Sequence, residues 1–257
     1  MPGMDAVSVR KDLVYKTDGS LSLAMDVYSP PSVRGGSKDP AVLFLHGGVG
    51  PAFPVRPKEW GIYRSWGRLA AASGLVGVTF NHRVGFPDPA LDVAASDLRD
   101  AVAFVRSHAA EYGVNPNRIA LAAYSAGGPL LAAAIREPAP YVRCLVAFYA
   151  FLDLSGSALH RKFLDAEAIR RFSPAVALAD ARGALPPIFV ARAGRDSIPD
   201  LQPGLDRFVS EAVAKNVDLA FFNQPGGEHG FDNDPGDPRS REIVRAAIEF
   251  LKTNLRR

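Results

Sequence analysis

Residues 118–131 read Arg118-Ile-Ala-Leu-Ala-Ala-Tyr-Ser-Ala-Gly-Gly-Pro-Leu-Leu131. The run from Ile119 to Ala123 is short and apolar, as in a buried strand, and an alanine-rich helix is predicted from about Ala126 to Arg136. A serine at so tight a strand-to-helix junction needs small neighbours, because the helix packs close against the strand. The stretch therefore predicts that the Ser125 hydroxyl projects above the edge of a sheet, beside a helix N-terminus that favours negative charge.

The motif at this junction is small-x-Ser-x-Gly, here Ala123-Tyr124-Ser125-Ala126-Gly127. Alanine stands where glycine is usual at its first position, which adds one methyl group at the crowded turn. Taken alone, the same letters fit a glycine-rich turn without chemistry, since short motifs produce many false positives. Whether Ser125 is a nucleophile depends on the rest of the chain.

Length and composition favour one large α/β domain over residues 1–257. The chain is 47% hydrophobic, which is enough for a sizeable core. Its net charge is only +3, with 27 acidic residues spread among the basic ones, so we expect no nucleic-acid partner. The single cysteine, Cys144, lies in an apolar run and is interpreted as a small buried hydrophobe.

The first seven residues, Met-Pro-Gly-Met-Asp-Ala-Val, contain neither a basic segment nor an apolar segment of the secretory kind. No apolar stretch elsewhere is long enough to span a bilayer. We therefore expect a cytoplasmic protein with no membrane partner.

The order of the predicted elements indicates the fold class. Val7 to Val14 and Leu21 to Tyr28 alternate as strands around a turn, which predicts an antiparallel N-terminal hairpin. From Ala41 onward apolar strands and amphipathic helices alternate. This pattern predicts an α/β fold with a mostly parallel central sheet and helices on both faces.

The strand Ala41 to Leu45 ends in His46-Gly47-Gly48. Glycines directly after a central strand let backbone N–H groups face the space at its C-terminal edge, where they can hold a developing oxyanion. Gly47 and Gly48, together with Ala126 after the serine, are therefore the candidate oxyanion donors. We interpret His46 as a structural residue that ties down this loop.

Aromatic residues follow the glycines and can line a substrate pocket. Phe53, Trp60 and Tyr124 are the candidate substrate contacts. Helical spacing leaves a second interpretation open for Trp60, Tyr63 and Trp66, which is that they pack a helix onto the sheet. The polar, irregular segment at about 152–179 is predicted to be an insertion over the sheet that forms a small lid.

Right-handed crossovers place every loop that follows a strand at one edge of a parallel sheet. Ser125, Asp196 and His229 all follow predicted strands, so we expect them to converge there. Singly, Asp196 or the nearby Asp200 can be a turn cap and His229 a loop histidine. Jointly, the chain order Ser, Asp, His is that of one hydrolase architecture.

On these motifs the chain resembles the α/β-hydrolase superfamily, and within it the carboxylesterase branch with a His-Gly-Gly loop, feruloyl-esterase-like and hormone-sensitive-lipase-like proteins included. The resemblance covers nearly the whole chain. It rests on residues 42–48, Phe80-Asn-His-Arg83, residues 118–128, Gly194-Arg-Asp196 and Glu228-His-Gly-Phe231.

The resemblance implies Ser125 as nucleophile, His229 as base and Asp196 as the acid that orients it, acting on a small-molecule ester of a short acyl chain without metal or cofactor. Two alternatives stay open: an amide hydrolase such as an arylformamidase or a peptidase-like enzyme of the same fold, and a non-catalytic binding protein of that fold. The sequence indicates neither the acyl or alcohol group nor the oligomeric state.

Overall fold

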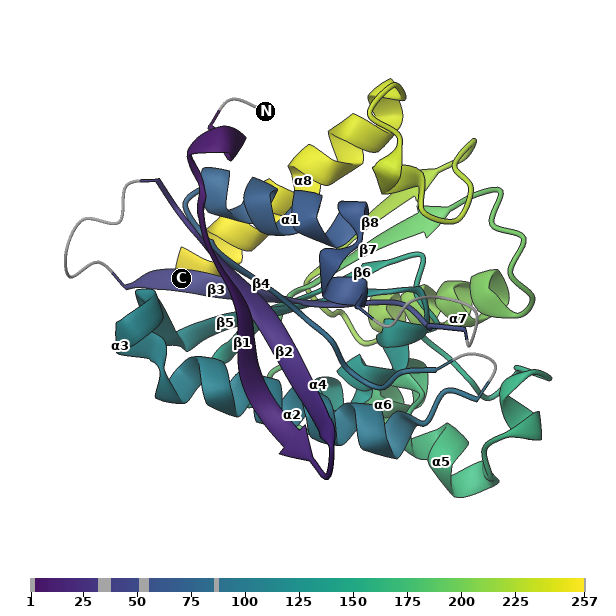
Figure 1. Ribbon diagram of the computed structural model, residues 1–257. Helices are drawn as coiled ribbons and strands as arrows, with labels where there is room; N and C mark the ends of the chain where they lie inside the picture. Colours follow the sequence, from purple (N-terminus) through teal and green to yellow (C-terminus); the bar gives the residue numbers. More distant parts are fainter. Residues whose placement is uncertain (1–2, 32–37, 51–55, 86–87, 257) are drawn as a thin grey trace.

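The computed structural model describes residues 3–31, 38–50, 56–85 and 88–256 (Figure 1). Its strands are β1 Ser8–Asp18, β2 Leu21–Ser29, β3 Asp39–Leu45, β4 Val76–Phe80, β5 Val114–Tyr124, β6 Val142–Phe148, β7 Ile188–Ala193 and β8 Leu219–Gln224. Its α-helices are α1 Gly61–Ala72, α2 Leu91–Ser107, α3 Ala109–Tyr112, α4 Ala132–Arg136, α5 Ala166–Arg171, α6 Pro174–Asp180, α7 Leu201–Ala214 and α8 Pro238–Arg256. Short 3₁₀ helices are η1 Met4–Ala6, η2 Pro57–Glu59, η3 Ser125–Leu131, η4 His160–Lys162 and η5 Phe231–Asn233.

The strands form an eight-stranded sheet in the order β1-β2-β4-β3-β5-β6-β7-β8. β1 and β2 pair antiparallel, as do β2 and β4, and every pairing from β4 through β8 is parallel. The predicted fold class, a mostly parallel sheet with an antiparallel N-terminal hairpin, is therefore confirmed.

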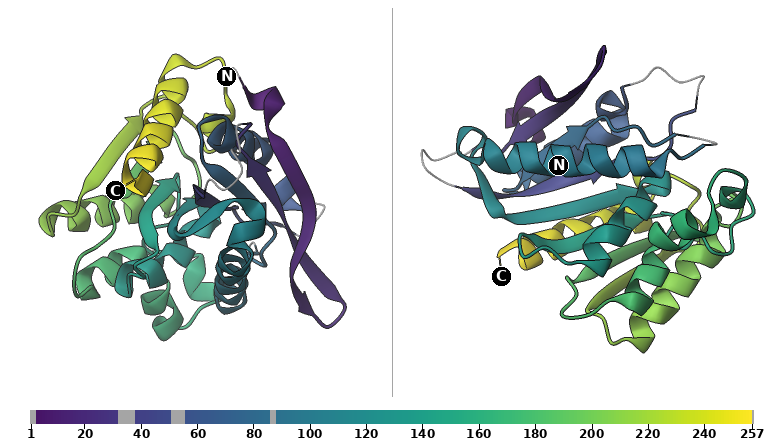
Figure 2. Two further views of the ribbon diagram at one scale, coloured as in Figure 1. Left: turned by 90° about the vertical axis from the view of Figure 1, so that its left-hand side faces the viewer. Right: turned by 90° about the horizontal axis from the view of Figure 1, so that it is seen from below.

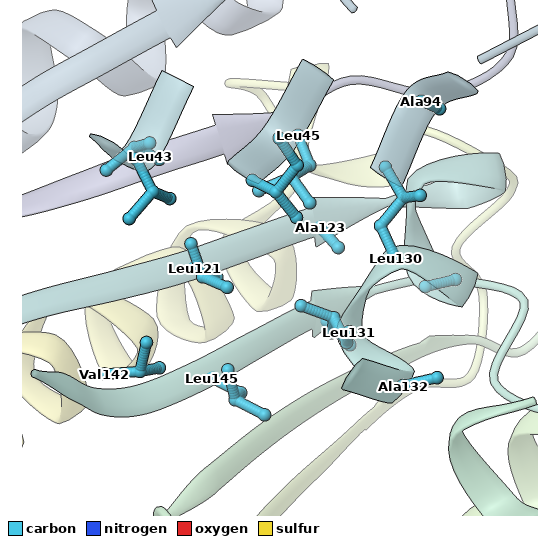
Figure 3. Close-up of a cluster of buried hydrophobic side chains, with 14 of the residues drawn as sticks. Leu43, Leu45, Ala94, Leu121, Ala123, Leu130, Leu131, Ala132, Val142 and Leu145 are labelled. Carbon is cyan, nitrogen blue, oxygen red and sulfur yellow. The ribbon is translucent and has the colours of Figure 1, made fainter. Parts of the chain in front are cut away.

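Helices cover both faces of this sheet (Figures 1 and 2). Alternate residues of β5 supply the two cores: Leu121 and Ala123 face the helices α2 to α7, while Ala122 and Tyr124 face α1 and α8. Figure 3 shows part of the first cluster, where Leu43, Leu121 and Leu145 from three neighbouring strands lie in a row, with Leu130 and Leu131 of η3 to their right. Both faces of the central strands are thus buried, which explains why these strands read as continuous apolar runs.

The strand register brings the C-terminal ends of the parallel strands level with one another. Leu45 of β3 lies opposite Ala123 of β5, and Tyr124 lies opposite Phe148 of β6. The loops that follow β3, β5 and β6 consequently begin side by side at one edge of the sheet.

The helix predicted from Ala126 to Arg136 is present at that position, but part of it is a 3₁₀ helix instead of an α-helix. Its first half is the 3₁₀ helix η3, and only the last five residues form α4. The sequence Gly127-Gly128-Pro129 explains the difference, because glycine and proline both disfavour the α-helix and Pro129 removes one backbone donor.

The segment predicted as a lid, residues 152–179, contains η4, α5 and most of α6. Ile169, Phe172 and Leu178 from this segment are buried in the core cluster that faces α2 to α7. α6 packs against α4 and α7, so this part of the segment belongs to the helical layer of the sheet. Its action as a lid stays a prediction.

Within the described ranges, no helix combines the length and the apolar character needed to cross a bilayer.

The glycine after Ser125 and Ala126 is required by a close approach of two backbones. A Cβ atom at Gly127 would lie 2.7 Å from the carbonyl oxygen of His46 and 2.9 Å from that of Leu45, both on the backbone that continues β3. These distances are shorter than van der Waals contact, and neither carbonyl can rotate away as a flexible side chain would.

We therefore expect Gly127→Ala to lower the free energy of unfolding by about 1–3 kcal/mol, as overpacking does in other cores. The measurement is urea unfolding, with Gly61→Ala as the matched control, because a Cβ at Gly61 meets nothing within 4 Å. Equal stability of the two variants would contradict the close approach.

Candidate active site

Ser125 lies directly after β5 with its backbone in the left-handed region, at φ 52°. This conformation costs a residue other than glycine roughly 1–2 kcal/mol. The strain turns the chain sharply from the strand into η3, and it leaves the serine partly exposed between buried neighbours. The local geometry is that of the strained strand-to-helix turn predicted from the sequence.

The glycine loop after β3 lies against this serine. A Cβ atom at Gly47 would lie 3.0 Å from the Cβ of Ser125 and 3.5 Å from its Oγ. A side chain at Gly47 would therefore crowd the hydroxyl, so glycine keeps this side of the serine open.

Asp196 and His229 are in direct contact. The Nδ1 atom of His229 lies 2.7 Å from Oδ2 of Asp196, and Oδ1 of Asp196 accepts a hydrogen bond of 3.0 Å from the Ile198 N–H. The Asp196 side chain is fully buried, whereas 29% of the His229 side chain is exposed. The arrangement fixes one edge of the imidazole and leaves part of the ring accessible.

The nearby Asp200 has other partners. Its carboxylate accepts hydrogen bonds from the Ser157 hydroxyl at 3.2 Å and the Ala158 N–H at 2.9 Å. Asp200 therefore caps the turn after β6, and Asp196 is the carboxylate that faces His229.

In the part of the chain that the structure describes, no hydrogen bond joins the Ser125 hydroxyl to His229. Such bonds are often long in the absence of substrate and shorten when it binds. The structure thus joins Asp196 to His229, and Gly47 to Ser125, as two halves of the predicted site.

The two candidate glycine amides differ in availability. The Gly47 N–H donates a hydrogen bond of 2.9 Å to the hydroxyl of Tyr63 on α1, so it is already engaged. The Gly48 N–H donates to no group among the described residues. The Ala126 N–H lies in the first turn of η3, where amides have no intrahelical acceptor. Gly48 and Ala126 are therefore the better candidates for an oxyanion, and Gly47 is held by Tyr63.

His46 has the structural role expected from the sequence. Its Nε2 accepts a hydrogen bond of 3.1 Å from the His82 N–H, so its proton is on Nδ1, which lies 2.7 Å from the carbonyl oxygen of Gly47. Burial lowers the pKa of His46 to about 4, which keeps the ring neutral. The ring of His82 stacks on that of His46 at 3.7 Å, and its nitrogens have no hydrogen-bond partner among the described residues.

The three predicted substrate contacts have different outcomes. Tyr124 is 1% exposed and packs among Tyr63, Trp66 and Phe148, which is a position in the core rather than at a pocket wall. The alternation of β5 explains this correction, because Tyr124 points to the face covered by α1 and α8. Trp60 is partly exposed and stacks on Tyr63, so its contact with substrate stays a prediction. Phe53 lies outside the described residues.

Two residues beside the site were not predicted from the sequence. Tyr149 follows β6, and its ring meets that of His229 edge-on with centroids 4.7 Å apart. Its hydroxyl donates a hydrogen bond of 2.7 Å to Asp232, three residues after the histidine. Tyr149 could not be singled out from the sequence, because it lies inside the apolar run Cys144 to Phe151, and the whole of this run has the pattern of a buried strand.

The described residues around the histidine border two open cavities. One of about 570 Å³ is lined by His229 and the loop after β8, and another of about 500 Å³ lies between α1 and α8 beside Trp66 and Asp232. Ser125 lines neither of them, so the substrate pocket predicted from the aromatic residues stays a prediction. Among the described residues, no group of three or more His, Cys, Asp or Glu side chains is placed to hold a metal ion.

Comparison with known proteins decides the family. A model of the dienelactone hydrolase family matches residues 89–255, a range that includes Ser125, Asp196 and His229. The chain belongs to the dienelactone hydrolase family. A second family model, BD-FAE, matches residues 25–137, which carry the His46-Gly47-Gly48 loop and Ser125. The predicted resemblance to esterases of the α/β-hydrolase superfamily is confirmed by these matches and by the relatives that follow.

Among curated proteins, this chain is similar to esterase LipQ of Mycobacterium tuberculosis, with 24% identity over 93% of this chain and 61% of that protein. It is also similar to isoprenylcysteine alpha-carbonyl methylesterase ICME of Arabidopsis thaliana, with 27% identity over 88% of this chain and 58% of that protein. The chain thus spans about three fifths of the length of these two relatives.

Among solved structures, esterase 2 of Thermogutta terrifontis superposes with a TM-score of 0.77 and 23% identity over 98% of this chain and 96% of that one. The structure compared is that of the enzyme phosphoramylated by tabun, and further structures of esterase 2 hold propionate and butyrate. The match shows the same fold from end to end.

The stacked histidines His46 and His82 predict a pH dependence of stability. Burial lowers the pKa of both rings, so between pH 6.5 and about 4 the unfolded chain binds protons that the folded protein excludes. The free energy of unfolding therefore falls as the pH falls through this window, by about 1.4 kcal/mol per pH unit and group.

His82→Phe keeps a ring in the stack and removes one of the two groups. We expect the melting temperature of this variant to fall less steeply from pH 7 to pH 4.5 than that of the unmodified protein. Calorimetry across this range measures both slopes, and identical slopes would mean that His82 is not buried in its neutral form.

Proposed function

We propose that this chain is a carboxylic ester hydrolase that works through an acyl-enzyme intermediate on Ser125. The observation that carries the proposal is the Asp196–His229 pair at 2.7 Å, in a chain whose Ser125 occupies a strained turn after the central strand. Nucleophile, base and orienting acid are the three roles that serine acyl hydrolysis requires.

The hydrogen bond to Asp196 sets the protonation of the base. A carboxylate can only accept, so the neutral imidazole of His229 carries its proton on Nδ1 and leaves Nε2 free to accept another. Nε2 takes the Ser125 proton as the hydroxyl attacks the acyl carbonyl, and Asp196 stabilises the imidazolium that results. His229 then protonates the leaving alcohol, and water repeats the sequence on the acyl enzyme.

The developing oxyanion is assigned to the amides of Gly48 and Ala126. One such donor is worth roughly 3–4 kcal/mol of transition-state stabilisation in well-studied enzymes. Tyr63 contributes indirectly, because its hydrogen bond to the Gly47 N–H holds the loop that presents Gly48.

The named activities of the relatives support an ester as substrate. LipQ is named an esterase and ICME a methylesterase, and esterase 2 has been solved with propionate and butyrate, both short carboxylates. We extend this to short acyl groups for the present chain. A triad does not by itself distinguish ester from amide, so the test below includes both.

The proposal is tested on p-nitrophenyl esters of graded acyl length beside aryl formamides. We expect kcat/KM to be highest between acetyl and about hexanoyl, because each methylene adds about 0.8 kcal/mol only while it finds apolar surface. A kcat/KM that rises through dodecanoyl esters would indicate a lipase. Faster turnover of the formamides than of every ester would assign the site to amide hydrolysis.

The choice of acid is tested by a matched pair of substitutions. Asp196→Asn should lower kcat by about 10⁴-fold, as the same substitution does in another serine triad, because the amide no longer favours the required tautomer and imidazolium. Asp200→Asn is the control, since Asp200 caps the turn at Ala158. A large loss of kcat in Asp200→Asn together with a small loss in Asp196→Asn would assign the role of the acid to Asp200.

A further inference from the structure

A second carboxylate lies near His229 and is held by two donors. Asp232 is partly buried in η5, and its Oδ1 and Oδ2 accept hydrogen bonds of 2.7 Å from the Tyr149 hydroxyl and from Nε1 of Trp66 on α1. No basic side chain among the described residues pairs with this carboxylate. Asp232 thus ties together three parts of the fold: the loop of the histidine, the end of β6 and helix α1.

Tyr149 is the part of this group that touches the base. Its backbone is in the left-handed region at φ 35°, which is costly for a residue with a large side chain. Its N–H still donates to the Ala191 carbonyl oxygen at 2.8 Å, so the chain turns immediately after the last bond of β6. The turn sets the ring edge-on against His229, with an interplanar angle of 62°.

We propose that Tyr149 and Asp232 are positioning residues for the catalytic histidine, an inference that rests on the proposed function. Asp232 fixes the far end of the Tyr149 ring through its hydroxyl, and the ring confines the imidazole of His229. Asp196 alone holds His229 at a single atom, about which the imidazole can still tilt. The tyrosine ring restricts that tilt and keeps Nε2 directed toward the serine.

The electrostatic surroundings agree with this role. Three groups act on His229: Asp196 at its Nδ1 atom, Tyr149 against its ring, and Asp232 through its charge. Burial raises the pKa of the Asp232 carboxyl, while the bonds from Tyr149 and Trp66, and the charge of a protonated His229, act to lower it. The Asp232 anion is therefore favoured most when His229 carries the proton it takes from serine.

The first test is a double-mutant cycle with Tyr149→Phe and Asp232→Asn, measured on a short p-nitrophenyl ester. Tyr149→Phe keeps the ring and removes its tether, and we expect each single variant to lose about ten-fold in kcat with KM changed less than two-fold. Because both act through one hydrogen bond, the double variant should be no slower than the slower single variant. The inference would be overturned if the two single losses in kcat multiplied in the double variant, or if the substitutions changed only KM.

The control is Tyr112→Phe, which removes a hydroxyl from a buried tyrosine of α3, before the first residue of β5 and away from the catalytic edge. It should leave kcat unchanged. We expect Tyr149→Phe and Tyr112→Phe to have similar melting temperatures. The loss of kcat in Tyr149→Phe would then come from the position of His229 and not from a general loss of stability.

A second readout does not depend on activity. The proton shared by Nδ1 of His229 and Asp196 should give a far-downfield ¹H NMR signal, assigned by its loss in His229→Gln. We expect this signal to broaden or shift in Tyr149→Phe and to be unchanged in Tyr112→Phe. An unmodified protein that cleaves no ester would reject the proposed function, while this signal would still decide the inference: an unchanged signal in Tyr149→Phe overturns it.

Discussion

The backbone carbonyls of Leu45 and His46 stand where a side chain at position 127 would lie, and the rest of the site depends on this close approach. It brings the first turn of η3 against the end of β3, so that Ser125 and Gly47 become neighbours. The strained backbone of Ser125 is the local cost of the turn, and the buried strand and helix on either side maintain it. Ser125 and Gly47, which are far apart in the sequence, thereby form one half of the site.

The other half is built by the parallel topology. β7 and β8 are neighbours in the sheet, and the loops after them carry Asp196 and His229. Backbone hydrogen bonds of 2.8 Å from Gly194 to Gln224 and from Arg195 to Gly227 lock these loops together beyond the strands. The short distance between the acid and the base therefore follows from strand pairing, and it requires no long flexible side chain.

The loop after β4 is anchored separately. Arg83 donates two side-chain hydrogen bonds, of 2.9 and 2.8 Å, to Asp97 on α2, and Lys16 from β1 lies 2.8 Å from the same carboxylate. Burial alone would raise the pKa of Asp97, but the bonds from Arg83 and Lys16 prevail and lower it. This pairing fixes His82 and, through the stacked rings, the loop of His46 and Gly47.

The sequence predicted the elements and the edge at which they meet, because apolar periodicity and chain order report on burial and on parallel topology. It also predicted the places of Ser125, Asp196 and His229 along the chain, each just after a strand. It could not predict that Tyr124 belongs to the core, since a one-residue alternation along β5 decides which face the ring takes. Nor could it predict that Tyr63 engages Gly47 or that Tyr149 contacts His229, because these contacts join distant segments and depend on the packing of α1 and the end of β6.

The central claim is that Ser125 is the nucleophile, and covalent trapping tests it most directly. Intact-mass spectrometry after incubation with paraoxon should show one diethylphosphoryl group per chain, peptide mapping should locate it on Ser125, and Ser125→Ala should remain unlabelled while keeping its melting temperature. Labelling at another residue, or no labelling of a folded protein that still cleaves esters, would contradict the assignment.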